Sequence, residues 1–197
     1  YYQVSDDTAL ECQFYWAIYK VANRQLALNE AKRLWVTGDS LPNECEPLLS
    51  ALVLSPVFST DLIWQRFELA LKKDNRPLAS YIQHLLNKPD QDAAEVWLQV
   101  HKRPELIQNN LFLAGNEQEG RIFAHGVDRI AKSDLDLAIN IWDSKKRNIV
   151  IDSQIVQQLE RRLALALAHA RDNRAYDRLN QVIAVDAEVR EWKVRAA

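Results

Sequence analysis

Apolar residues recur at helical spacing along nearly the whole chain, and this periodicity constrains the fold more than any other feature. Only four glycines interrupt the 197 residues, and runs of β-branched residues are few. The clearest stripe, in residues 60–75, consists of Leu62, Ile63, Phe67, Ala70 and Leu71. Ser59 stands where it can cap that helix. Because only residues 148–152 (NIVID) show weak strand character, we predict an all-α protein with about ten or eleven helices.

The expected helices are joined by short connections. They cover residues 11–23, 25–38, 43–54, 60–75, 76–87, 91–102, 104–115, 120–133, 134–146, 152–172 and 174–184, and a helical pattern continues at 188–197. Their predicted boundary signals include Gly38 as a C-cap, Pro77 in a first helical turn and Pro89 as a stop. In the first helix we expect Phe14, Ala17, Ile18 and Val21 to form the buried stripe.

Short connections between successive helices imply antiparallel neighbours, and helices of this length stack most naturally as pairs. Three helices begin with Asn-Arg, at residues 23, 75 and 173, like the second helix of a tetratricopeptide pair, although no constant 34-residue period exists. The predicted fold class is therefore a right-handed α-superhelix, or solenoid, of stacked antiparallel helix pairs, similar to tetratricopeptide arrays.

Composition narrows the class of protein further. Apolar residues make up 48% and charged residues 26%, as in globular rather than disordered chains. A net charge of -2 disfavours a nucleic-acid binder, and no apolar run has the length of a membrane span. The chain has no methionine and no signal peptide at its start, and its last residues stop inside a helical pattern. We expect it to be a piece of a longer protein.

The chain has two cysteines, Cys12 in a predicted helix and Cys45 just beyond a turn. They form no Cys-x-x-Cys motif, and too few soft ligands stand nearby for zinc. Neighbouring helices in a hairpin array would bring them close enough for a disulfide, which would close a loop of about 34 residues. From the residues alone, two separate buried thiols and a disulfide formed in an oxidising compartment both remain open.

Residues 12–52 strongly resemble the soluble lytic murein transglycosylases of the Gram-negative periplasm. The matching residues are Cys12, Trp16, Ala31, Leu34, Trp35, Gly38, Ser40, Leu41, Pro42, Cys45 and Leu48. The resemblance continues through residues 64–86, loosens between about 105 and 150, and returns at Glu160, Arg161, Arg162 and Ala166. It implies a disulfide between Cys12 and Cys45, because the two matching cysteines are bridged in that family.

The resemblance also implies a function for the longer protein. These enzymes cleave the β-1,4 bond between N-acetylmuramic acid and N-acetylglucosamine in peptidoglycan, giving 1,6-anhydro products without metal or organic cofactor. Their catalytic glutamic acid lies in a Glu-Ser motif followed by a Gly-Leu-Met-Gln stretch, and neither is present here. We expect residues 1–197 to be part of one superhelical domain, truncated at both ends, without the linker and lysozyme-like catalytic domains. It would be a non-catalytic, periplasmic scaffold, with peptidoglycan strands and other cell-wall enzymes as partners of the full-length protein.

Other candidate residues favour structural roles. Glu68, in the sequence IWQRFELAL, is the most tempting acid, but a solvated position beside an apolar stripe explains it better. His84, His101, His125 and His169 lack ligand spacing, so no metal site is expected. The six tryptophans are mostly expected in the core rather than on sugar rings. The basic residues Lys145, Lys146, Arg147, Arg161, Arg162, Arg171 and Arg174 are interspersed with Asp143, Asp152, Glu160 and Asp172, which is typical of a solvated face. A tetratricopeptide-like module that binds a protein partner remains the alternative function.

Overall fold

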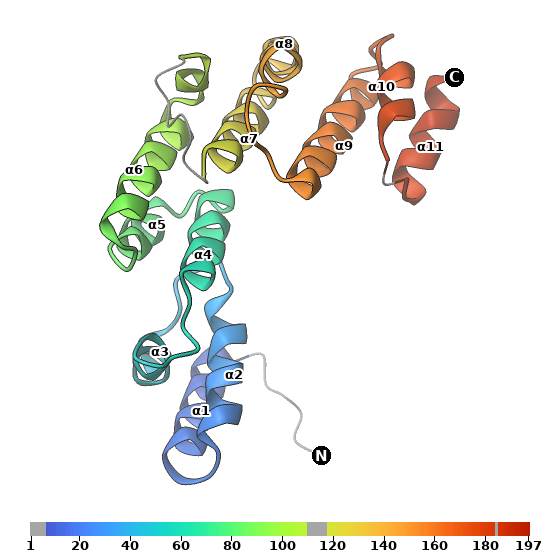
Figure 1. Ribbon diagram of the computed structural model, residues 1–197. Helices are drawn as coiled ribbons and strands as arrows, with labels where there is room; N and C mark the ends of the chain where they lie inside the picture. Colours follow the sequence, from blue (N-terminus) through green and yellow to red (C-terminus); the bar gives the residue numbers. More distant parts are fainter. Residues whose placement is uncertain (1–6, 110–117, 184) are drawn as a thin grey trace. The chain divides into compact units, whose positions relative to one another are not determined.

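A computed structural model describes residues 7–109, 118–183 and 185–197, and these residues form helices and connections without a strand (Figure 1). Eleven α-helices and two 3-10 helices lie in this part of the chain. The all-α prediction is confirmed, whereas the weak strand signal at 148–152 is wrong. Among the described residues, no helix combines the length and apolarity that crossing a membrane requires. The chain divides into two compact units, Tyr1–Asp92 and Ala93–Ala197.

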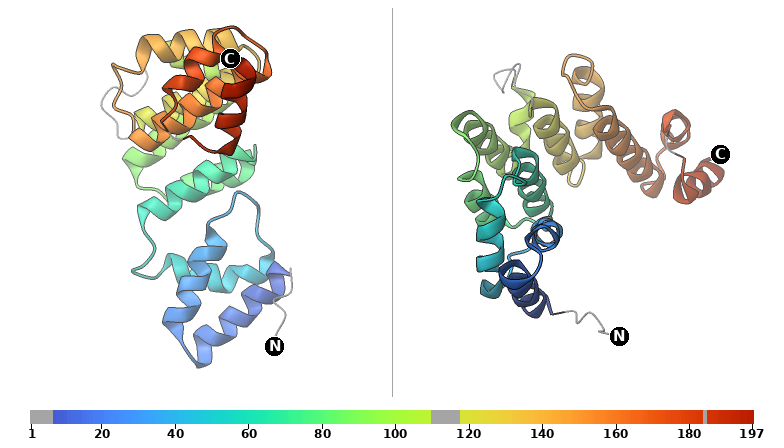
Figure 2. Two further views of the ribbon diagram at one scale, coloured as in Figure 1. Left: turned by 90° about the vertical axis from the view of Figure 1, so that its right-hand side faces the viewer. Right: turned by 60° about the horizontal axis from the view of Figure 1, so that its bottom comes forward.

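The first unit contains five α-helices and one 3-10 helix, which pack largely as neighbours in chain order (Figures 1 and 2). They are α1 (Thr8–Val21), α2 (Arg24–Trp35), η1 (Asn43–Cys45), α3 (Glu46–Val53), α4 (Thr60–Lys72) and α5 (Arg76–Gln83). Helix α1 packs on α2, both contact α3, and α4 packs on α5. The next helix, α6 (Lys88–Lys102), begins at the end of this unit and continues into the second.

Side chains that cap helices explain where these elements begin. The Ser59 hydroxyl accepts a hydrogen bond from the Leu62 amide at the start of α4, as predicted. Asn23 and Asn75 cap α2 and α5 in the same way, so two of the three Asn-Arg pairs are true helix starts. Pro77 lies in the first turn of α5. The stop expected at Pro89 is wrong, because that proline occupies the first turn of α6, where a missing N–H costs nothing.

The buried face of α1 differs from the expected stripe. Phe14 and Val21 are 57% and 83% exposed, while Cys12 is fully buried and Tyr15 and Trp16 pack against the core. Helix α1 is therefore rotated relative to the prediction. The face that carries Cys12 must point inward, because Cys45 lies on that side.

Gly38 is not the C-cap of α2, which ends at Trp35 with Val36 as the cap residue. Instead, the backbone at Gly38 lies directly against α4, where an added Cβ would come within 2.2 Å of the Leu69 carbonyl oxygen. The Asn75 side-chain amide donates a hydrogen bond of 3.2 Å to the Gly38 carbonyl. Gly38 therefore allows the loop after α2 to approach α4 closely.

The second unit is again a series of packed helices. After most of α6 come η2 (Pro104–Gln108), α7 (Glu119–Ile130), α8 (Leu135–Lys145), α9 (Ser153–His169), α10 (Ala175–Gln181) and α11 (Ala187–Ala196). Helix α7 packs on η2, α8 and α9, and α10 packs on α9 and α11. The helix expected over 104–115 is a short 3-10 helix at its start, and residues 110–115 lie outside the described part. The core includes the stacked rings of Phe123 and Trp142, whose centroids are 5.8 Å apart.

Candidate functional site

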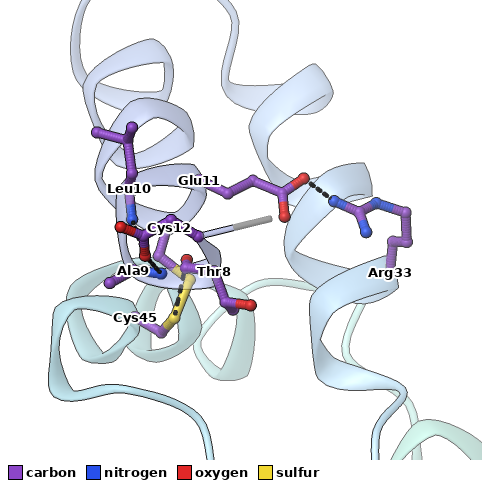
Figure 3. The surroundings of a disulfide bond; sticks show 8 residues. Thr8, Ala9, Leu10, Glu11, Cys12, Arg33 and Cys45 are labelled. Atoms are coloured by element: carbon purple, nitrogen blue, oxygen red, sulfur yellow. Dashed lines mark hydrogen bonds and ion pairs between the residues drawn. A yellow bond between two sulfur atoms is a disulfide. The ribbon is translucent and has the colours of Figure 1, made fainter. Parts of the chain in front are cut away.

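The two cysteines form a disulfide in the first unit. Cys12 of α1 and Cys45 at the end of η1 are fully buried, and their Cα atoms are 4.8 Å apart (Figure 3). Beside them, the Glu11 carboxylate extends from α1 toward Arg33 of α2 and forms an ion pair with it. Arg33 also pairs with Glu30, 2.8 Å away. A covalent bond therefore joins α1 to η1, immediately before α3, and a charged cluster joins α1 to α2.

A cavity of about 540 Å³ opens beside α3, between α2 and its following loop on one side and α4 and α5 on the other. Its apolar lining includes Trp35, Leu41, Leu49, Val53, Leu78 and Leu85. One cationic side chain, Arg66 of α4, lines it as well. This size and mostly apolar character fit a small-molecule pocket with one anchoring charge.

Arg66 is only 4% exposed, yet it has no acidic partner among the described residues. Its buried Nε has no hydrogen-bond partner. The guanidinium stacks on the Trp35 ring, 4.4 Å from the ring centroid. Burial lowers the pKa of Arg66 to about 10, a shift that the nearby Tyr81 opposes. The group is therefore still a cation at neutral pH.

A second depression, of about 570 Å³, lies beside α1. Trp16 and Tyr19 stack there with centroids 5.3 Å apart, and Lys20 and Arg24 lie over the rings of Trp16 and Tyr19, respectively. These four residues belong to the half-buried and exposed surface of the unit. They form an aromatic surface, with its cations already placed on the rings.

The basic residues of the second unit are largely paired with carboxylates. Arg178 donates to Asp143 at 2.7 Å and to Glu160 at 3.0 Å, and Lys146 contacts the same two acids. Other pairs join Arg161 to Asp186 and Glu188, Arg162 to Asp128, and Arg174 to Asp136 and Asp172. Lys145 donates to the Gln108 carbonyl, and Arg147 and Arg171 are exposed. This arrangement supports the solvated, self-neutralised face that the sequence indicated.

Two histidines that the sequence analysis treated as unrelated lie together. His101 Nδ1 and His125 Nε2 are 3.0 Å apart, and Arg129 lies 3.4 Å from the other nitrogen of His101. No sequence pattern indicated this contact, because the two histidines are on α6 and α7 with residues 110–117 between them. His84 is exposed at the end of α5, and His169 packs edge-to-face on Trp192. Within the described residues, no group of three or more potential ligands is arranged to hold a metal.

The remaining candidates are Glu68, expected at a solvated position, and the tryptophans, mostly expected in the core. Glu68 is half-buried on α4, between the buried Phe67 and Ala70 positions. Four tryptophans are buried, at positions 35, 64, 97 and 142, and two are half-buried, at 16 and 192. Arg66 is the residue that sequence reasoning missed. It stands three residues after Ile63 and four before Ala70, so its helical position belongs to the buried stripe.

The sequence was compared with protein families and with curated proteins. No family model matches the chain. A soluble lytic murein transglycosylase of Escherichia coli strain K12 is 27% identical over 100 residues, which are 51% of this chain and 16% of that protein. The Salmonella typhimurium enzyme of the same name is 32% identical over 75 residues, or 38% of this chain and 12% of that protein. Over these segments the chain is similar in sequence to soluble lytic murein transglycosylases.

Solved structures agree with this relationship. An inactive variant of the lytic transglycosylase Slt from Pseudomonas aeruginosa matches with a TM-score of 0.88 and 22% identity, over all of this chain and 32% of that one. The 70 kDa soluble lytic transglycosylase of Escherichia coli matches with a TM-score of 0.65 and 20% identity, over 98% of this chain and 29% of that one. At these identities the match shows the fold, so the predicted superhelical, all-α fold class is confirmed. The chain spans less than a third of these transglycosylases.

Proposed function

We propose that this chain is a non-catalytic scaffold portion of a periplasmic lytic transglycosylase. In this role, residues 1–197 are part of one superhelical domain, and the longer protein's catalytic domain cleaves the bond between N-acetylmuramic acid and N-acetylglucosamine to give 1,6-anhydromuropeptides. The supporting observation is the match of the whole chain to part of the Pseudomonas aeruginosa lytic transglycosylase. The chain's own chemistry is consistent with it, since it contains no Glu-Ser motif.

The disulfide supports the assignment of a compartment. A buried bridge between Cys12 and Cys45 persists in an oxidising environment such as the periplasm and is rare in the reducing cytosol. It holds α1 to the segment that leads into α3, at one end of the described helix series. The scaffold's contribution is geometric: packed helices present a fixed surface to murein strands and to other cell-wall enzymes, with no metal or cofactor required.

The experiment is a pull-down of the purified chain on murein sacculi, followed by chromatography of the supernatant for anhydromuropeptides. We expect binding to sacculi and no release of products. If anhydro products exceeded the blank, the non-catalytic assignment would be wrong, and Glu68→Gln would be the first variant to test. If neither binding nor products were found, a protein-binding module of the tetratricopeptide kind would explain the helical array better.

A thiol titration of protein recovered from the periplasm tests the compartment separately. We expect free thiols only after reduction under denaturing conditions. Two free thiols in natively exported material would argue against a periplasmic scaffold that is held by this bridge.

A further inference from the structure

The cavity beside α3 holds a positive charge that the protein does not neutralise. Arg66 is buried to more than nine-tenths of its surface, and none of the described carboxylates pairs with it. Glu46 and the hydroxyls of Ser40 and Ser50 line the same cavity, but none of them bonds to Arg66. A buried cation without a partner is costly, whereas an apolar side chain of similar size would fill the position without that cost.

The guanidinium is also held in place before any ligand arrives. Its central carbon lies 4.4 Å from the centroid of the Trp35 ring, and that ring is fixed by a hydrogen bond of 2.9 Å from its Nε1 to the Leu62 carbonyl. The Phe58 ring packs nearly perpendicular to the same ring, with the two centroids 5.0 Å apart. This contact holds the guanidinium at the ring, and a guanidinium presents its N–H groups as a planar fork. Such a fork matches the two oxygens of a carboxylate.

The remaining lining of the cavity determines which ligand can lie next to the charged group. Leucine and valine side chains from α3, α5 and the loop after α2 line it, together with Tyr81 of α5. Its volume of about 540 Å³ holds a few amino-acid residues rather than a long polymer. The exposed Glu46 in the lining disfavours ligands with several negative charges, such as phosphates or polyacids.

We propose that this cavity binds the terminal carboxylate of a short peptide with small apolar side chains, with Arg66 as the anchoring residue. Together with the proposed function, this identifies the free end of a murein peptide stem as the ligand. The scaffold would then bind the peptide part of murein and also present a surface to the glycan strands.

The test titrates the full chain with diacetyl-Lys-D-Ala-D-Ala and with its C-terminal amide, a control that differs only in the charge. Binding is followed by Trp fluorescence, to which Trp35 contributes, and by calorimetry. We expect the acid to bind in the millimolar range and the amide at least about tenfold more weakly. Equal affinity of acid and amide, or no binding of the acid, would overturn the proposal.

Two variants locate the site. Arg66→Met should weaken binding of the acid at least about tenfold and bring it to the level of the amide. Arg24→Met is the matched control, because Arg24 is also stacked on an aromatic ring in the first unit but lies outside the cavity. A thermal melt of each variant shows whether it is folded. Unchanged binding by a folded Arg66→Met protein, or equal losses in both variants, would contradict the assignment to Arg66.

A third arm separates this inference from the proposed function. The same peptide ending in L-Ala-L-Ala carries the carboxylate without the murein stereochemistry. Preference for the D-peptide supports a stem-peptide ligand, and equal or tighter binding of the L-peptide would overturn that identification. If the Arg66→Met protein still bound sacculi but had lost its affinity for the peptide, the scaffold role would be supported. Arg66 would then act in peptide binding only.

Discussion

Each unit of the molecule contains an arginine that is largely withdrawn from water, and the two arginines have opposite surroundings. Arg178 of the second unit reaches Asp143 and Glu160 with its terminal nitrogens. Arg66 of the first unit is stacked on Trp35 and has no acidic partner among the described residues. Carboxylates of the protein neutralise the Arg178 charge, although its Nε, like that of Arg66, has no hydrogen-bond partner. The Arg66 charge is left for something else to neutralise. Charge satisfaction therefore distinguishes a structural arginine from a candidate ligand anchor.

Removing the disulfide should have the largest effect and should be confined to the first unit. We expect the Cys12→Ala, Cys45→Ala double variant to lose about 3–4 kcal/mol of unfolding free energy, because the bridge limits the entropy of the unfolded loop. Denaturant titration measures the loss, and amide hydrogen exchange localises it. If amide exchange in α8 and α9 increased as much as in the first unit, the two units would not respond separately to the loss of the disulfide.

Breaking the satisfied arginine should come next. Arg178→Met leaves Glu160 partly buried and without one of its cations, so we expect a loss of about 2–3 kcal/mol of unfolding free energy. The loss should be smaller than for a fully buried pair, because the side chain of Asp143 is 44% exposed. The measurement is the denaturation midpoint compared with the exposed-site control Arg147→Met. A change as small as that of the control would mean that the network contributes little to stability.

The unsatisfied arginine should respond in the opposite direction. We expect Arg66→Met to range from unchanged stability to a gain of about 1 kcal/mol, since the variant removes an unpaired buried charge. Thermal and chemical denaturation of the variant provide the measurement. A large loss of unfolding free energy would show that the contact of Arg66 with Trp35 stabilises the fold. Both arginines would then be structural, and the contrast between them would disappear.

The smallest expected effect is a dependence on pH in the second unit. Burial raises the pKa of Asp143, but hydrogen bonds from Arg178 and Lys146 outweigh it, so the folded-state pKa lies below the ordinary value. This carboxylate therefore contributes stability above an unfolded pKa of about 3.9, and the contribution is lost as the pH falls through the folded pKa. Asp143→Asn should flatten the acid limb of a stability–pH curve. Asp177→Asn, at an exposed position on α10, should leave it unchanged.

Much of the helix pattern followed from the sequence, because periodicity and caps are local properties. The stripe of α4 and its Ser59 cap were predicted residue by residue. The buried face of α1 was not predicted, because Tyr and Trp side chains can be buried or half-exposed. The residue that determines this face is Cys45, which is distant in the sequence. Arg66 was missed because charge suggests a surface, although its place in the stripe pointed inward. The contact between His101 and His125 depends on how α6 meets α7, which no local pattern encodes.

The side chain of Asn75 forms hydrogen bonds that deamidation would affect differently. Its side-chain oxygen accepts from the Leu78 amide at the start of α5, and its side-chain nitrogen donates to the Gly38 carbonyl. Spontaneous deamidation to aspartate would keep the first bond and destroy the second, because a carboxylate has no proton to donate. In stored protein, the tie between the loop after α2 and α5 would therefore be lost while the helix itself stayed capped. The first sign of ageing in this unit would be a looser loop rather than a lost helix.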